Sequence, residues 1–145
     1  MKKIYCILTF LLLVMSAFEM SAQVDRKDVR RGNRDFKKEN FREAEIDYRK
    51  ALVKDSLSVA ANYNLASTLY REGDMEQAAK VLDRVKEAAP AGSSAADYWY
   101  NRGDVALQMK DYQTAVDAFA ESLKLNPDDL DAKENFIYAR KMLQN

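Results

Sequence analysis

Few side chains in this sequence are of the types that usually carry out catalysis or bind metals. The 145 residues contain no histidine and a single cysteine, at position 6. Imidazole bases, histidine-ligated metals and cysteine-based zinc sites are therefore excluded. The sequence contains no glycine-rich phosphate loop, no nucleophile elbow, and no serine or lysine with an identifiable base partner. We therefore expect no enzyme and no cofactor.

One cluster of carboxylates, formed by Asp128, Asp129 and Asp131, has the chemistry to bind a cation. A calcium loop of the EF-hand type needs a central glycine and a distal bidentate glutamate, and neither follows at the required spacing. Carboxylates also stabilise the positive N-terminal end of a helix, and the residues that follow suit a helix. We therefore predict a helix over about 128–143 and no metal site.

Aromatic and hydrogen-bonding side chains at helical spacing favour a different chemistry, the binding of a peptide or a partner helix. Tyrosine provides contact area at a low cost in side-chain entropy and keeps a polar tip. The predicted partner-binding residues are Asn33, Phe36, Lys37, Tyr63, Ser67, Tyr70, Arg71, Tyr100, Asp104 and Leu107. Val29, Ala60 and Asp97 lie on the same predicted faces. The alternative is that the tyrosines only fill the space between neighbouring helices.

These candidates fall within three segments that repeat one pattern. Small residues align at Gly32, Ala66 and Gly103 and again at Ala44, Ala78 and Ala115, and large apolar residues follow at Tyr48, Leu82 and Phe119. Each unit has the apolar periodicity of two short helices that bury one face. Glycine, or asparagine in the left-handed conformation, ends a helix at low cost. The turns within the pairs are therefore expected at Glu39-Asn40, Gly73-Asp74 and Lys110-Asp111.

The units are expected at about 25–58, 59–92 and 96–129, and the helix over 128–143 should cover the third unit as a cap. The second interval is longer than the first, and its extra residues coincide with the segment 91–95. We expect a longer loop there, before a helix that begins near Ala96. The sequence thus predicts an all-α domain over 23–145 that consists of stacked helix pairs.

This repeated pattern resembles the tetratricopeptide repeat (TPR) family, whose signature runs tryptophan, leucine-glycine, tyrosine, alanine, phenylalanine, proline. The third unit carries it most fully, at Trp99, Gly103, Ala115, Phe119 and Pro127, whereas Arg31 and Arg102 depart from it. The resemblance implies a right-handed superhelix of three helix-turn-helix repeats plus a C-terminal capping helix. The first helix of each pair would line a concave groove that binds a protein segment.

One subclass of this family grips the terminal carboxylate of a peptide with lysine, asparagine and arginine side chains. In this sequence Asn33 and Asn64 occupy matching places, whereas Val29 stands at the place of the first lysine. Asp97 and Asn101 replace the remaining cations. The comparison with that subclass therefore disfavours recognition of an acidic C-terminus.

The first 22 residues have the order of a secretory signal peptide. Two lysines precede an uncharged run over 4–18, and a short polar stretch ends at Ala22. The run is shorter than the roughly 20 residues that span a bilayer as a helix. We expect cleavage after Ala22, which would remove Cys6 and leave no direct membrane span. The alternative is an uncleaved anchor, and both alternatives export the domain.

The equal numbers of basic and acidic residues disfavour nucleic acid as a partner. The sequence contains 23 Lys and Arg residues against 23 Asp and Glu residues, so bulk attraction to phosphate is absent. The basic residues of the segment 26–38 alternate with acidic ones. We expect a solvated helix there with contacts four residues apart, such as Arg31 with Asp35.

An exported chain with the segments FKKENFREAEIDYRKAL, AANYNLASTLYREGDMEQAA and DAKENFIYARKML is also similar to the small TPR protein of bacterial aerotolerance (Bat-type) operons. That resemblance implies a periplasmic scaffold that acts with membrane-anchored von Willebrand A-domain proteins. The function we expect is therefore non-catalytic interaction with a protein partner, through which the chain could associate with the membrane. The alternative is a structural module that self-assembles into homo-oligomers without a foreign peptide ligand.

Overall fold

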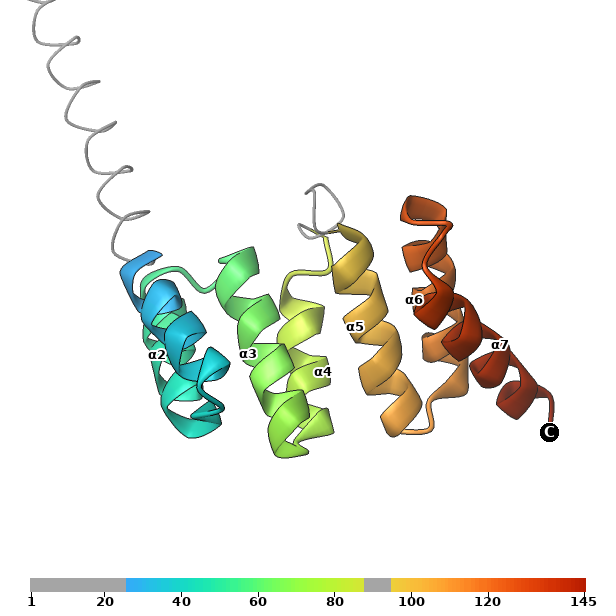
Figure 1. Ribbon diagram of the computed structural model, residues 1–145, viewed down its shortest axis with the longest axis horizontal. Helices are drawn as coiled ribbons and strands as arrows, with labels where there is room; N and C mark the ends of the chain where they lie inside the picture. The colour runs from blue at the N-terminus through green and yellow to red at the C-terminus, as the bar shows by residue number, and fades with distance from the viewer. Residues whose placement is uncertain (1–25, 88–94) are drawn as a thin grey trace, which may run out of the picture.

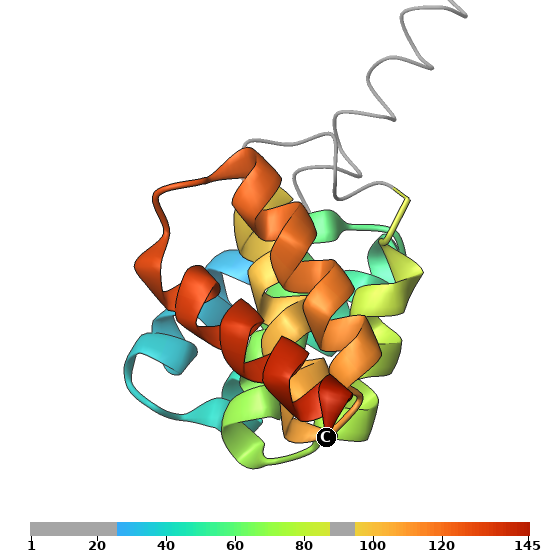
Figure 2. The same cartoon turned by 90° about the vertical axis from the view of Figure 1, so that its right-hand side faces the viewer.

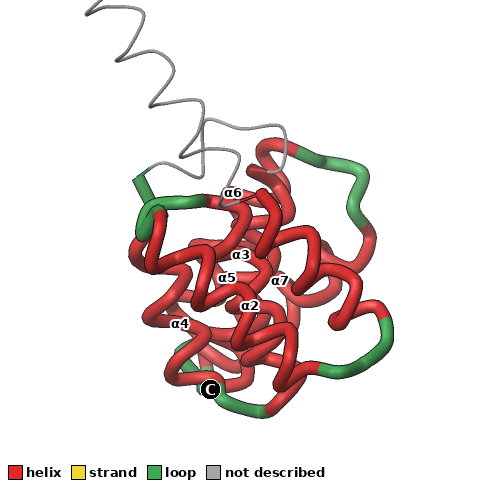
Figure 3. Tube along the Cα trace, turned by 90° about the vertical axis from the view of Figure 1, so that its left-hand side faces the viewer, coloured by secondary structure: helices red, strands yellow, loops and turns green. Residues whose placement is uncertain are grey.

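The computed structural model describes residues 26–87 and 95–145, and every regular element within these ranges is a helix. The first helix covers 26–37. It is followed by α2 (Phe41–Lys54), α3 (Val59–Glu72), α4 (Met75–Arg84), α5 (Ala95–Gln108), α6 (Tyr112–Leu125) and α7 (Leu130–Gln144). Figure 3 shows helices and connecting loops throughout the described residues. The predicted all-α class is confirmed.

The helices form three pairs and a final single helix. Helix 26–37 pairs with α2, α3 with α4, and α5 with α6, and the pairs stand side by side along the long axis of the molecule (Figure 1). The first helices of neighbouring pairs touch, because α3 contacts α5 and α5 contacts α7. Figure 2 faces the C-terminal end and shows α7 closing the row beside α6. The expected architecture of stacked helix pairs is confirmed.

The turn within each pair contains one residue in the left-handed backbone conformation. These residues are Glu39 with φ 62°, Gly73 with φ 86° and Lys110 with φ 60°. The side chains of Asp74 and Asp111 then accept hydrogen bonds from the backbone N–H groups of Gln77 and Thr114, which caps α4 and α6. In the first turn the left-handed residue is Glu39 and not the asparagine that was expected to adopt this conformation.

The two helices of a pair meet where a small residue faces a large one. A Cβ atom added to Gly103 would lie 2.6 Å from Cε1 of Phe119, and one added to Gly32 would lie 2.6 Å from Cε1 of Tyr48. Both positions therefore exclude any side chain while the aromatic ring is present. The second pair has the larger Ala66 together with the shorter Leu82, both buried in the same apolar cluster.

Both arginines that depart from the repeat signature take part in ion pairs between helices. The Arg31 guanidinium donates two hydrogen bonds of 2.5 and 2.6 Å to the carboxylate of Asp47 on α2, and a third of 3.2 Å to Asp28. The sequence instead suggested Asp35 as the partner of Arg31. The structure differs because α2 brings a nearly buried carboxylate against the guanidinium. Arg102 on α5 pairs with Asp83 of α4.

The acidic segment before α7 acts as a helix cap. The Asp129 carboxylate accepts a hydrogen bond of 3.0 Å from the backbone N–H of Ala132, as the capping interpretation predicted. In the described part of the chain, no three acidic or cysteine side chains are grouped so that they could hold a metal ion. None of the described helices has the length and apolar character needed to cross a membrane. The predicted leader over 1–22 and most of the predicted longer loop, 91–94, lie outside the described residues.

Candidate partner-binding groove

Two hollows lie between the first helices of neighbouring pairs. One has a volume of about 430 Å³ and is lined by Phe36, Ala66, Ser67, Tyr70, Arg71, Leu82, Asn101, Asp104 and Val105. The other has a volume of about 690 Å³ and is lined by Asn33, Phe36, Lys37, Tyr48, Tyr63, Asn64 and Ser67. The two hollows are adjacent, because Phe36 and Ser67 line both, and together they extend over helix 26–37, α3 and α5. We call the two hollows together the groove.

Most of the predicted partner-binding residues line the groove. They are Asn33, Phe36, Lys37, Tyr63, Ser67, Tyr70, Arg71 and Asp104. Tyr63 and Tyr70 are half-buried, so each ring is supported by the fold and still reaches the surface. The Arg71 guanidinium lies 5.5 Å from the centre of the Phe41 ring, a distance suited to a cation–π contact at the rim.

Two predicted residues, Tyr100 and Leu107, do not line the groove. Both pack against the buried cluster that includes Phe119 and Ala139, and the Tyr100 ring meets Phe119 edge-on with 5.7 Å between the ring centres. The sequence placed them on an open face because it did not show that α7 packs against that part of α5. Val29 is also buried in the core, with 9% of its surface exposed, although it was expected on the binding face.

A row of hydrogen bonds joins each first helix to the next along the groove. In each bond an asparagine Nδ2 donates to a side-chain oxygen of the preceding first helix. The bonds run from Asn64 to Asn33 at 2.9 Å, from Asn101 to Ser67 at 3.2 Å and from Asn135 to Asp104 at 3.1 Å. We call this row the asparagine ladder. It joins four helices: 26–37, α3, α5 and α7.

The ladder was missed at the level of the sequence, although a signal for it is present. Asn64 and Asn101 each stand two residues before the small residue that marks the repeat, Ala66 or Gly103, and Asn135 stands two residues before Ile137 in the same register. Sequence reasoning considered Asn64 as a possible clamp residue or a common structural residue of the repeat, and Asn101 only as a replacement for a clamp cation. The structure assigns them to contacts between helices.

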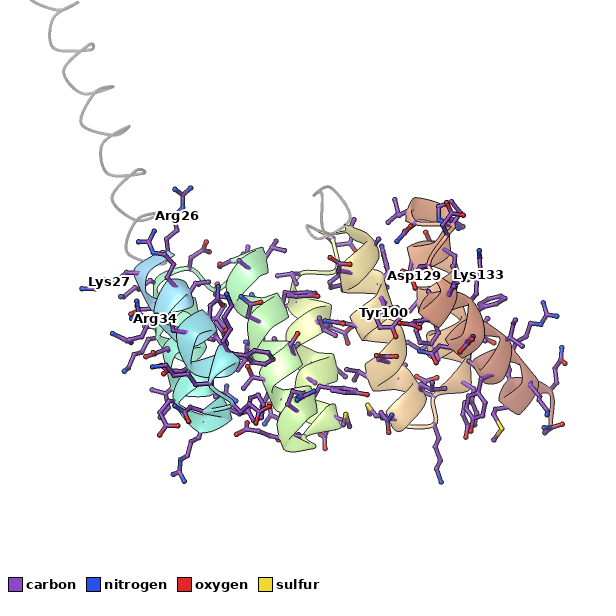
Figure 4. All side chains as sticks on the ribbon, viewed as in Figure 1. Arg26, Lys27, Arg34, Tyr100, Asp129 and Lys133 are labelled. Carbon is purple, nitrogen blue, oxygen red and sulfur yellow. The ribbon has the colours of Figure 1, made fainter. Side chains whose placement is uncertain are left out.

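Carboxylates gather beside the groove, between α5 and α7. Burial, and after it the nearby carboxylate of Asp131, raises the pKa of Asp104 to about 6. Burial raises the pKa of the Tyr100 hydroxyl to about 12, with further contributions from Asp104, Asp131 and Asp129. Figure 4 shows Tyr100 between α5 and the start of α7, where Asp129 lies.

Two cationic side chains also line the groove. Lys37 and Arg71 stand at its edge and are exposed. Arg26, Lys27 and Arg34 also lie on helix 26–37, but none of them lines either hollow (Figure 4). The groove thus combines cationic, anionic, aromatic and amide side chains, and Arg71 lines the same hollow as Asp104.

Comparison with known proteins identifies the repeated unit. The sequence model of the Tetratricopeptide repeat family matches residues 57–128, which include the second and third helix pairs. These pairs are tetratricopeptide repeats. The fold agrees with this assignment along the whole described chain, since the TPR domain of Sgt2 from Aspergillus fumigatus superimposes with a TM-score of 0.73 over 83% of this chain and 79% of that one, at 18% sequence identity.

Two further TPR structures are similar to this chain and contain peptides. The first TPR of Spaghetti (RPAP3), bound to the HSP90 peptide SRMEEVD, has a TM-score of 0.75 and 19% identity over 83% of this chain and 94% of that one. The second TPR domain of human RPAP3, in complex with the HSP70 peptide SGPTIEEVD, has a TM-score of 0.70 and 20% identity over 84% and 97%. At these identities the likeness shows a shared fold.

One curated relative is more similar in sequence. Cell division cycle protein 27 homolog A of Arabidopsis thaliana is 33% identical over 101 residues, which amount to 70% of this chain. This TPR protein spans only 14% of the length of that relative. The match therefore concerns the repeats and not the whole of the larger protein.

Proposed function

We propose that this TPR protein is a non-catalytic scaffold that holds a segment of a partner protein in the groove. The observation that carries the proposal is the pair of adjacent hollows that share Phe36 and Ser67, with half-buried tyrosines on their walls. Tyrosines in this position provide rigid contact area and a hydroxyl group that can hydrogen-bond to the partner. The peptides in the two RPAP3 structures support segment binding by this fold.

We propose further that the protein acts outside the cytoplasm, in the periplasm of a bacterium. The order of charged, apolar and small residues over 1–22 supports export. The similarity of three sequence segments to the aerotolerance-type TPR protein supports a place in an envelope complex. Its membrane-anchored von Willebrand A-domain proteins are then the proposed partners, and they would bring the scaffold to the membrane.

Replacement of both groove tyrosines tests the binding function. We expect Tyr63→Ala combined with Tyr70→Ala to abolish cross-linking of the partner in the envelope, because the wall of each hollow loses one tyrosine ring. The helical circular-dichroism signal should remain. Tyr112→Ala is the matched control, since Tyr112 is half-buried at the start of α6 and lines neither hollow. Unchanged cross-linking by the double variant would contradict the proposal.

Self-assembly is the second candidate, and exposed apolar side chains on α7 favour it. Leu130, Ile137, Tyr138 and Leu143 are 70%, 64%, 52% and 44% exposed. A second copy could cover this surface. Light scattering over a hundredfold range of protein concentration separates the two candidates. A mass that stays at the monomer value contradicts self-assembly and leaves groove binding unaffected.

A further inference from the structure

The carboxylates between α5 and α7, beside the groove, indicate which class of peptide segment fits it. We propose, on the basis of groove binding as proposed above, that the partner segment carries a lysine or arginine whose cationic group lies between Asp104 and Asp131, with Asp97 farther along α5. An adjacent apolar side chain of the same segment enters the hollow between Phe36 and Tyr70. The partner is thus a basic, partly apolar peptide segment and not an acidic one.

These carboxylates are not neutralised within the described chain. The ion pairs among residues 26–87 and 95–145 involve other acidic residues, and none includes Asp97, Asp104 or Asp131. Asp97 and Asp131 are exposed, and Asp104 is half-buried at the wall of the groove. Arg71 lines the same hollow as Asp104, but none of the described ion pairs joins the two. Carboxylates without an ion-pair partner on a concave surface attract cationic groups.

The negative charge of Asp104 is not needed for the ladder. Asn33 and Ser67 occupy the corresponding acceptor places, and both accept an asparagine N–H with neutral oxygen atoms. An asparagine at position 104 could accept the same bond from Asn135. The fold also disfavours the charge, because burial and Asp131 raise the pKa of Asp104 to about 6. A charge that is costly to the fold and unnecessary for its hydrogen bonds is typical of a binding function.

A cationic side chain fits this charge better than the alternatives do. No three of the described carboxylates are grouped closely enough to hold a metal ion, whereas a long lysine or arginine side chain can lie between separated carboxylates. An acidic segment would lack the cations that the carboxylate-clamp subclass offers it, because Asp97 and Asn101 stand in their places and Val29, at the place of the first lysine, is buried in the core. Peptides such as SRMEEVD and SGPTIEEVD, which end in glutamate, valine and aspartate, are therefore expected to bind poorly.

Selection from random heptapeptides displayed on phage tests the proposal on the purified protein. We expect the selected peptides to be enriched in Lys and Arg over Asp and Glu relative to the unselected library. For one selected cationic peptide, we expect Asp104→Asn combined with Asp131→Asn to weaken binding about fivefold, as for a partly exposed ion pair. Added salt should weaken binding to the wild type more than binding to this variant.

The matched control removes two negative charges elsewhere. Glu43→Gln combined with Asp117→Asn gives the same change in net charge at exposed residues outside the groove, and it should leave the affinity unchanged. Selection of acidic or neutral peptides whose binding depends on Tyr63 and Tyr70 overturns the charge proposal and keeps the groove. Equal binding of the cationic peptide to the wild type and to the Asp104→Asn, Asp131→Asn variant would likewise overturn the charge proposal and keep the groove. If no selected peptide depends on the two tyrosines, the proposed function itself fails.

Discussion

Asn135 of α7 donates from Nδ2 to Oδ1 of Asp104 on α5 at 3.1 Å, and the same amide donates to the Tyr100 hydroxyl at 3.3 Å. These bonds hold α7 against α5 in the way that Asn64 holds α3 against the helix 26–37. The final single helix is therefore docked as if it were the first helix of another pair. Buried or half-buried polar bonds of this kind define the register between helices whose apolar contacts alone could slide.

Asn135→Ala is expected to loosen α7. The substitution removes the donor for both Asp104 and Tyr100, and Asp104 keeps no hydrogen-bond partner among the described residues. We expect the free energy of unfolding to fall by roughly 1–2 kcal/mol at pH 7.5, where Asp104 is charged. Urea unfolding monitored by circular dichroism measures the change. Lys133→Ala, at an exposed position on the same helix, is the control and should change stability by less than about 0.5 kcal/mol. Equal losses of stability in the Asn135 and Lys133 variants would refute the role of the ladder.

The contact of Gly103 with Phe119 leads to a second prediction. In Gly103→Ala the new methyl group would lie 2.6 Å from the Phe119 ring, which is closer than non-bonded carbon atoms can approach each other. We expect a loss of about 2–3 kcal/mol from the displacement of α5 relative to α6. Thermal and urea unfolding of the purified variant measure this loss.

A double variant serves as the control for that prediction. The second pair combines Ala66 with Leu82 at the corresponding positions, so Gly103→Ala together with Phe119→Leu reproduces a combination that this fold already contains. We expect the loss of unfolding free energy in the double variant to be smaller than the sum of the losses in the two single variants, by about 1–2 kcal/mol. Strict additivity of the two losses would show that the glycine is not there to admit the ring.

The register of small and large residues explains why the fold could be predicted from the sequence. Gly103 and Phe119 lie on helices that are joined by one short turn, so their facing positions follow from local helical spacing. The same reasoning applies to the aspartates that cap α4, α6 and α7, because capping acts within a single turn.

Contacts between separate pairs were not predictable in the same way. The spacing placed Tyr100 on an open face, yet α7 packs against α5 and draws the Tyr100 hydroxyl into a hydrogen bond with Asn135. Even within the first pair, Arg31 pairs with Asp47 of α2 and not with its neighbour Asp35. Helical periodicity tells which residues share a face, but the identity of the helix that covers that face depends on packing in three dimensions.

The ion pair of Arg31 with Asp47 makes part of the stability dependent on pH. The hydrogen bonds from the guanidinium hold the pKa of Asp47 below its ordinary value of about 4. A carboxyl group with a lowered pKa in the folded state contributes stability above its ordinary pKa, and the contribution is lost as the pH falls through the lower folded value. Asp47→Asn should therefore be less stable than the wild type at pH 7, and the difference should shrink below about pH 4.

Thermal unfolding of the Asp47 variant at pH 7 and at pH 3 measures that dependence. Glu76→Gln is the control, because Glu76 forms an exposed pair with Lys80 that contributes little. It should lower the melting temperature much less than Asp47→Asn at pH 7. A difference between the Asp47 variant and the wild type that does not change with pH would contradict the role of the ion pair.

Asp104→Asn is expected to have the opposite effect to Asp47→Asn, namely an increase in stability at neutral pH. The folded-state pKa of Asp104 is raised to about 6, so the protonated form is favoured by the fold and stability is lost as the pH rises from about 4 through 6. Asparagine removes this cost and keeps an acceptor for Asn135. Because Asp104 is partly exposed, we expect a gain of only roughly 1 kcal/mol at pH 7.5 and almost none at pH 3.5. Urea titrations at both pH values measure this gain, and Asp97→Asn at an exposed position is the control. A loss of stability in Asp104→Asn at pH 7.5 would show that the ladder requires the charge. It would also remove the main argument for a cationic partner.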